Sequence, residues 1–157
     1  MIKIICVGKI KEAYLKDAIN EYLKRLSRFN KFEIIELKDC PIKENSSELE
    51  DLKVKDEEGR LILSKITNEY VIALDPNGNE IDSIQFSNKL SSIFNSSKSD
   101  ISFIIGGSLG LSQEVKDRAD YIMSFSKLTF PHQLFRVILL EQIYRAYKIM
   151  KGETYNK

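Results

Sequence analysis

The sequence is poor in the residues that build metal centres and disulfide frameworks. Its 157 residues include two cysteines, Cys6 and Cys40, and a single histidine, His132. The cysteines are isolated and form no CxxC pair, so neither a zinc site nor any other metal site is expected. Both cysteines are interpreted as reduced, partly buried residues, which favours a cytoplasmic protein.

Long apolar runs and a strong net charge are also missing. The apolar run at residues 2–7 is too short for a signal peptide or a membrane span, so we expect no contact with a membrane. The net charge of +1 gives no global attraction to nucleic acid, so any such contact needs a local basic patch. The length of 157 residues fits one globular domain covering residues 1–157.

What is present is an alternation of strand and helix patterns. Apolar, β-branched runs predict strands at residues 2–7, 32–37, 70–74, 101–105 and 121–125. Apolar residues at helical spacing predict helices at residues 12–26, 47–66, 82–94, after Ser112, and at 131–150. Five strands alternating with five helices predict an α/β fold, a three-layer sandwich with a mainly parallel sheet.

Three local features add detail to this prediction. Ser47 with Glu50, and Asp82 with Gln85, have the spacing of helix N-termini. The residues 75–79, DPNGN, predict a turn that ends the third strand. The charged helix that begins after Ser47 is expected to be a peripheral, mobile element.

The last predicted helix carries apolar residues on more than one face. One side can pack on the sheet, but the surplus needs a second surface. For a soluble chain of this size, this surplus predicts a homodimer.

Two loops that follow predicted strands carry the small and polar residues of a ligand site. Gly106, Gly107 and Gly110 follow the strand at 101–105, and a loop rich in Ser, Lys and Thr, residues 124–129, follows the last strand. Open α/β sheets bind ligands at the carboxyl ends of their strands. The residues therefore predict an α/β protein that binds a nucleotide-like ligand between the two loops.

The glycine-containing loop matches none of the common nucleotide or nucleophile motifs. No Gly-Lys-Ser/Thr follows it, and its spacing is not GxGxxG. Only Gly8 follows the first strand, which disfavours a nicotinamide-dependent oxidoreductase. No GxSxG elbow is present. His132, at a helix start, has two interpretations: a residue bonded to backbone or water, or a titratable group in a cleft.

The segments IIGGSLGLS and SFSKLTFPHQLFRVILLEQIYRAYKIMKGETY closely resemble the RlmH family of SPOUT methyltransferases. The resemblance extends to the opening KIICVGKIKEAYLKDAINEYLKRL and so covers essentially the whole chain. It implies an α/β fold whose C-terminal part forms a trefoil knot that binds S-adenosylmethionine. It also implies a homodimer that methylates N-3 of a pseudouridine in a stem-loop of 23S ribosomal RNA, at the decoding-region interface, within the assembled ribosome.

The resemblance assigns site residues as well. The family's cofactor contacts correspond here to Leu74, Gly106, Phe125, Ser126, Lys127, Leu128, Thr129 and Phe130. Methylation at nitrogen needs no enzyme nucleophile, so the protein must align the reactants and accept or relay a proton. The candidates for catalysis are His132, Arg136 and Tyr155, of which Arg136 is better suited to recognise phosphate or base.

The end of the chain departs from the family pattern. The family usually has a Tyr-His pair before its last residue, whereas this chain has Tyr155-Asn156. The alternative function is therefore a non-catalytic ribosome- or RNA-binding module on the same fold, which has no reason to retain cofactor binding. Contacts with RNA are expected from basic residues of two subunits. These are Lys9, Lys11, Arg25, Arg28, Arg136, Arg145, Lys148 and Lys151.

Overall fold

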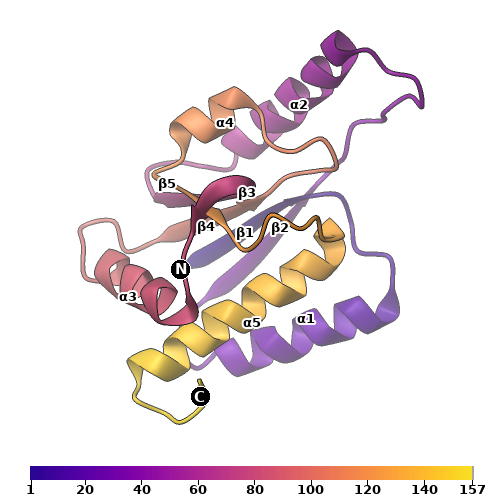
Figure 1. Cartoon of the computed structure of the whole chain (residues 1–157). Coiled ribbons are helices and arrows are strands. Elements are labelled where there is room, and N and C mark those ends of the chain that lie inside the picture. Colours follow the sequence, from indigo (N-terminus) through magenta and orange to yellow (C-terminus); the bar gives the residue numbers. More distant parts are fainter. Residues whose placement is uncertain (157) are drawn as a thin grey trace.

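Five apolar segments form one parallel β-sheet, as their β-branched composition predicts. The computed structural model describes residues 1–156 (Figure 1). The strands lie in the order β2-β1-β4-β3-β5, and each neighbouring pair is parallel. Their bounds are β1 Ile2–Val7, β2 Phe32–Leu37, β3 Tyr70–Glu80, β4 Ile101–Ile105 and β5 Tyr121–Ser124.

The helices cover both faces of this sheet. On one face lie α1 (Ala13–Leu26), α3 (Ser83–Phe94) and α5 (His132–Met150), and α5 packs against both of the others. On the opposite face lie α2 (Glu48–Leu63) and α4 (Gln113–Arg118), which contact each other (Figure 1). The predicted three-layer α/β sandwich is confirmed, with a sheet that is parallel throughout.

Side-chain caps fix the starts of three helices. The Ser47 side chain accepts a hydrogen bond from Glu50 N–H at the start of α2. Asp82 and Gln85 form a reciprocal capping box at the start of α3. Ser112 accepts from the backbone N–H of Val115 and so starts α4. All three starts agree with the sequence pattern, because a cap depends only on residues within one turn of each other.

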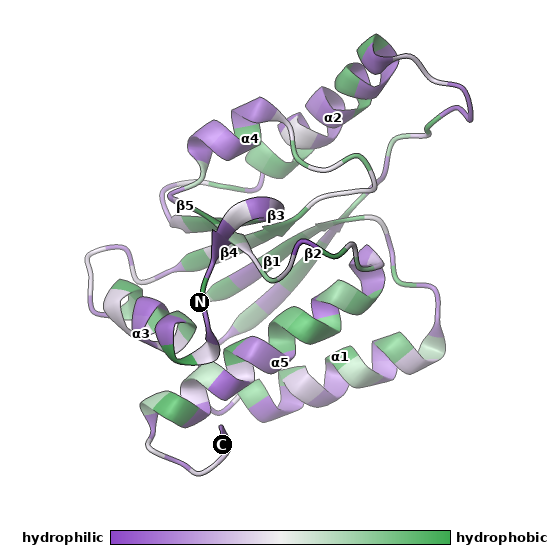
Figure 2. Ribbon diagram, in the orientation of Figure 1, coloured by the Kyte–Doolittle hydropathy of each residue, from purple (hydrophilic) through white to green (hydrophobic). Residues whose placement is uncertain are grey.

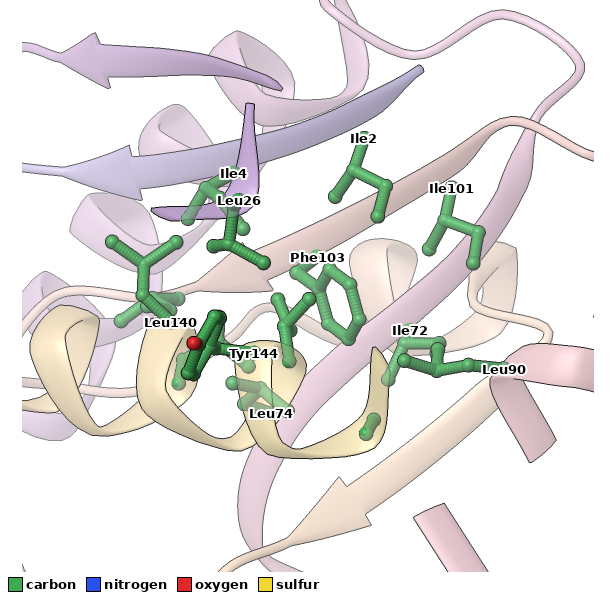
Figure 3. Close-up of a cluster of buried hydrophobic side chains, with 14 of the residues drawn as sticks. Ile2, Ile4, Leu26, Ile72, Leu74, Leu90, Ile101, Phe103, Leu140 and Tyr144 are labelled. Carbon is green, nitrogen blue, oxygen red and sulfur yellow. The ribbon is translucent and has the colours of Figure 1, made fainter. Parts of the chain in front are cut away.

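The larger hydrophobic core lies between the sheet and α1, α3 and α5. Figure 3 shows Ile4 and Phe103 of the sheet close to Leu140 and Tyr144 of α5. The smaller core lies under α2 and α4, and α4 is hydrophilic over most of its outer surface (Figure 2). Leu111, which follows β4, is buried in this smaller core.

The predicted turn at residues 75–79 is wrong. These residues continue β3, which curls beside β5 (Figure 1). Leu74 and Asn79 both pair with Met123, so the residues between them bulge out of the ladder. The Asn79 side chain donates to Ile122 O at 3.2 Å, and an added Cβ at Gly78 would lie 2.8 Å from the same carbonyl group. Pairing with β5 therefore overrides the local turn signal.

The charged helix α2 ends earlier than predicted and is only partly peripheral. Leu49 and Leu52 are exposed, whereas Glu58 and Gly59 are buried. An added Cβ at Gly59 would lie 2.3 Å from Ser112 Oγ. Glycine weakens an isolated helix, but here it allows α2 to approach the start of α4.

Two predictions about the whole chain stand apart from these elements. The trefoil knot requires the chain after β5 to pass through an earlier loop, and it stays a prediction, as does the homodimer.

Within residues 1–156 no helix combines the length and the apolar character needed to span a bilayer.

Candidate functional site

The carboxyl ends of β3, β4 and β5 open into one cleft of about 820 Å³. Parallel strands end at the same edge of a sheet, so the loops that follow them meet there. The glycine loop (residues 106–111) follows β4, and the serine loop (residues 124–131) follows β5. Asp75, Pro76 and Asn77, from the bulged part of β3, complete the lining on a third side.

The glycine loop folds back on itself in a tight turn that favours glycine at positions 106 and 110. Gly110 has φ +86° and its N–H donates to Gly107 O at 3.1 Å, a tight turn that other L-residues disfavour. An added Cβ at Gly106 would lie 2.8 Å from Leu111 Cδ2 and 3.2 Å from the carbonyl of Gly110. Glycine at position 106 therefore allows the loop to fold closely against Leu111 and Gly110.

The serine loop is shaped by its own hydroxyl groups. Ser124 Oγ donates to Ser126 O at 3.1 Å, and Leu128 N–H donates to Ser126 Oγ at 3.0 Å. Below the loop, Phe125 packs on Phe135 of α5 with ring centroids 5.0 Å apart. The loop thus presents polar backbone groups beside an aromatic cluster.

The structure brings most of the predicted cofactor contacts together in this cleft. Its lining includes Leu74, Gly106, Phe125, Ser126, Leu128, Thr129 and Phe130. Lys127 belongs to the same loop but does not line the cleft. His132, the first residue of α5, does line it. The roles of all these residues as ligand contacts stay predictions.

Arg136 lies outside the lining and is buried, with 1% of its side chain exposed. Its Nη1 pairs with Glu36 Oε2 at 2.6 Å, and its Nη2 donates to Gly8 O at 2.6 Å. Glu36 Oε2 also accepts from Ile10 N–H at 3.0 Å. Partial burial raises the pKa of Glu36, but the hydrogen bonds from Ile10 and Arg136 outweigh it and hold that pKa below its usual value. Arg136 therefore ties α5 to the segment that follows β1.

Tyr155 lies at the opposite end of α5 from His132. Its hydroxyl donates to Glu141 Oε2 at 2.8 Å, and its ring packs on Tyr144 with centroids 5.2 Å apart. Burial and the Glu141 carboxylate raise the pKa of Tyr155 to about 12, so it stays protonated at neutral pH. Glu141 and Tyr144 follow His132 by nine and twelve positions, or roughly 14 and 18 Å along α5 at 1.5 Å per residue, which separates Tyr155 from the cleft of its own chain.

One charged residue of the cleft, Lys116, escaped the sequence analysis. Asp75 and Lys116 form an ion pair at 3.4 Å, and both line the cleft. Asp75 belongs to the segment 75–79, which was expected at the carboxyl end of a strand beside the glycine loop, and its place in the cleft agrees with that expectation. Lys116 lies on α4, where nothing in the local pattern distinguishes it from a solvated helix residue.

The two thiols agree with the prediction of reduced cysteines. Cys6 is buried and Cys40 is half-buried, and both are free. Burial raises the pKa of the Cys6 thiol to about 12, so it is an unreactive core residue. Within residues 1–156 there is no cluster of three or more His, Cys, Asp or Glu side chains suited to a metal ion.

A family model described as "Predicted SPOUT methyltransferase" matches residues 1–156. The chain belongs to the SPOUT methyltransferase family. Within it, the relatives confirm the resemblance to the large-subunit methyltransferase H group. Ribosomal RNA large subunit methyltransferase H 1 of Clostridium perfringens (strain SM101 / Type A) is 60% identical over 157 residues, covering 99% of each chain. The methyltransferase H of Clostridium tetani (strain Massachusetts / E88) is 57% identical with the same coverage.

A solved structure supports the fold independently of sequence. A probable methylase family protein from Haemophilus influenzae Rd KW20 matches with a TM-score of 0.54 at 10% identity, over 99% of this chain and 70% of that one. At this identity the likeness shows the shared fold and nothing about the ligand. The fold and the SPOUT assignment therefore rest on separate observations.

Proposed function

We propose that this SPOUT methyltransferase transfers a methyl group from S-adenosylmethionine to N-3 of a pseudouridine in 23S ribosomal RNA. The observation that carries the proposal is the cleft at the carboxyl ends of β3, β4 and β5, with the glycine loop along one side. The name shared by the close relatives supports large-subunit ribosomal RNA as the substrate.

The residues of the cleft fit S-adenosylmethionine. Gly106 lets the glycine loop pack against Leu111 and the Gly110 carbonyl, where a side chain would clash, and the polar backbone groups of the serine loop suit a nucleoside. Phe125 offers an aromatic contact to the adenine ring. Asp75 and Lys116 offer one charge of each sign to the ammonium and carboxylate groups of the methionine part.

The chain's own part in the reaction is alignment and proton acceptance. Bound S-adenosylmethionine supplies an electrophilic methyl group on a positively charged sulfur. The base must lose its N-3 proton as the new N–C bond forms and the S–C bond breaks. We assign His132 as the acceptor of this proton, because it alone among His132, Arg136 and Tyr155 lines the cleft of the described chain. No covalent bond between enzyme and base is required.

We further propose that the active form is a homodimer. Leu134 of α5 and Tyr14 of α1 are exposed by 39% and 70%, and they lie near the starts of two adjacent helices (Figure 1). Leu128, in the serine loop that precedes α5, is a further exposed apolar side chain and lines the cleft.

Leu134→Glu is expected to convert the dimer to a monomer, because a carboxylate would be buried without a partner in the apolar contact. Sedimentation velocity measures the change. Leu52→Glu is the matched control, since Leu52 is 48% exposed on α2, on the opposite face of the sheet. A Leu134→Glu variant that stays dimeric would assign the dimer contact to another surface.

Binding of RNA is proposed at a cluster of cations and aromatic rings where α1 and α5 end. The Arg25 guanidinium lies 5.4 Å from the Tyr22 ring centroid and 5.8 Å from that of Tyr144. Lys148 Nζ lies 5.8 Å from the same Tyr144 ring. Arg136 is buried, so we leave it out of this set. Such a mixture of cations and rings suits phosphates together with unstacked bases.

The wild-type chain is expected to methylate assembled ribosomes that lack the modification, and mass spectrometry of nuclease-digested ribosomal RNA locates the product.

His132→Gln is expected to slow methyl transfer by about 100-fold or more while leaving the affinity for S-adenosylmethionine unchanged. The rate on ribosomes should fall as salt rises, because phosphate contacts release counterions. A chain that binds ribosomes but neither binds S-adenosylmethionine nor transfers methyl groups would be the non-catalytic module instead.

A further inference from the structure

Glu58 of α2 is a buried carboxyl group that the proposed reaction does not use. Its surface is 4% exposed. Its Oε2 accepts a hydrogen bond from Cys40 N–H at 3.1 Å, whereas its Oε1 is buried and has no partner among residues 1–156. A buried polar atom without a partner destabilises a fold, so its presence needs a reason.

The unpartnered oxygen lies beside the glycine loop. An added Cβ at Gly107 would lie 3.0 Å from Glu58 Oε1, 3.3 Å from its Oε2 and 3.3 Å from Val7 Cγ1. The carboxyl group therefore packs directly on the backbone of Gly107. The next residue of α2, Gly59, packs on Ser112, which follows the loop and caps α4. Glu58 and Gly59 thus support both ends of the loop, and neither lines the cleft.

We propose that Glu58 is a positioning residue whose carboxyl group joins Gly107 to the segment at Cys40 and keeps the glycine loop in its cofactor-binding conformation. The inference rests on the proposed function, which supplies the ligand of the loop. A protonated carboxyl group has an O–H to donate toward the loop, whereas a carboxylate sets an unpaired charge against Gly107. The neutral form of Glu58 therefore stabilises the folded-back conformation of the glycine loop.

The surroundings of Glu58 favour this neutral form. Burial raises the pKa of Glu58, the hydrogen bond from Cys40 N–H opposes the rise, and the Asp39 carboxylate adds to it. Glu57 accepts a hydrogen bond from the Cys40 thiol at 3.4 Å, so a second acidic side chain lies close by. Lys55, one turn earlier on α2, lines the cleft. The uncharged side chains of Val7, beside Gly107, and of Ser112 and Val115, beside Gly59, also pack here.

The sign of the pH effect follows from these contacts. A group with a raised pKa loses its stabilising neutral form as the pH rises through that pKa. We therefore expect the affinity for S-adenosylmethionine to fall by about tenfold between the neutral and the ionised state of Glu58. Isothermal titration calorimetry on the full chain, at a series of pH values upward from the usual pKa of a glutamic acid, measures this fall.

Three variants distinguish a role of Glu58 in positioning the glycine loop from a general role in stabilising the fold. Glu58→Gln keeps a donor on the side chain and is expected to bind S-adenosylmethionine with the low-pH affinity of the wild type at every pH. Glu58→Ala removes both polar atoms and is expected to bind about tenfold more weakly at every pH. Glu44→Gln, which changes an exposed carboxyl group in the loop before α2, should keep the wild-type pH profile.

A second measurement tests the role of Glu58 without any cofactor. In the free chain, the backbone amide resonance of Gly107 should titrate with the pKa of Glu58 and stop titrating in Glu58→Gln. If the wild type binds no S-adenosylmethionine, the proposed function fails while this titration still tests Glu58. A Gly107 amide that ignores both pH and Glu58→Gln would overturn the inference, as would wild-type affinity in Glu58→Ala at every pH.

Discussion

Gly106→Val is expected to abolish binding of S-adenosylmethionine while the chain stays folded. An added Cβ at position 106 would lie 2.8 Å from Leu111 Cδ2 and 3.2 Å from the carbonyl of Gly110. Valine adds two methyl groups beyond that atom, so either the loop must move or the methyl groups must occupy part of the cleft. The expected loss of affinity is more than about 100-fold, measured by isothermal titration calorimetry.

Gly152→Ala is the matched control for this substitution. Gly152 follows α5 with φ +68° and has no atom within 4 Å of an added Cβ. Alanine there strains the backbone by about 1 kcal/mol without touching the cleft, so cofactor affinity should not change. Wild-type affinity in a folded Gly106→Val chain would show that the cofactor binds elsewhere and would remove the glycine loop from the proposed site.

Arg136→Ala is expected to lower the free energy of unfolding by about 3 kcal/mol. The substitution leaves Gly8 O without its donor and Glu36 without its cation. The value lies at the low end for broken buried pairs, because 36% of the Glu36 side chain is exposed and water can hydrate it. Urea unfolding followed by circular dichroism measures the change, with an unchanged slope as the sign of two-state behaviour.

An exposed pair of the same chemistry provides the comparison for Arg136→Ala. Arg25 pairs with Glu21 at 3.0 Å, and both side chains are largely exposed, so Arg25→Ala should leave stability nearly unchanged. If Arg136→Ala left stability intact but stopped methylation of ribosomes, Arg136 would return to the set of residues that contact substrate. The two measurements together decide whether Arg136 stabilises the fold around the site or contacts the substrate.

The sequence predicted the elements well wherever the determining contacts are local. The strand at Ile2–Val7 follows from an unbroken apolar run, and the starts of α2, α3 and α4 follow from caps within one helical turn. The glycine and serine loops were also predictable as parts of one site, because both follow strands of the same parallel sheet.

The features that the sequence did not predict depend on residues far apart in the chain. Arg136 was predicted to meet substrate, since no local pattern reveals its partner Glu36, 100 positions earlier. The end of β3 was predicted as a turn, because its pairing with β5 is invisible in the residues 75–79 themselves. The sequence analysis did not single out Glu58 in the charged helix that begins after Ser47, and only its packing on Gly107 distinguishes it from the other charged residues there.

The strand order has a consequence for how the chain is made. Ile2 pairs with Ile101 and Cys6 with Ile105, so β1 and β4, near opposite ends of the first two-thirds of the chain, lie side by side in the sheet. A nascent chain cannot form this ladder until residue 105 has emerged, and β3 gains its outer neighbour only when β5 follows. Pairings of such long sequence separation form slowly, because the intervening chain must be closed into a loop first. Folding of this sheet is therefore a late event in synthesis, completed when little more than α5 remains to be translated.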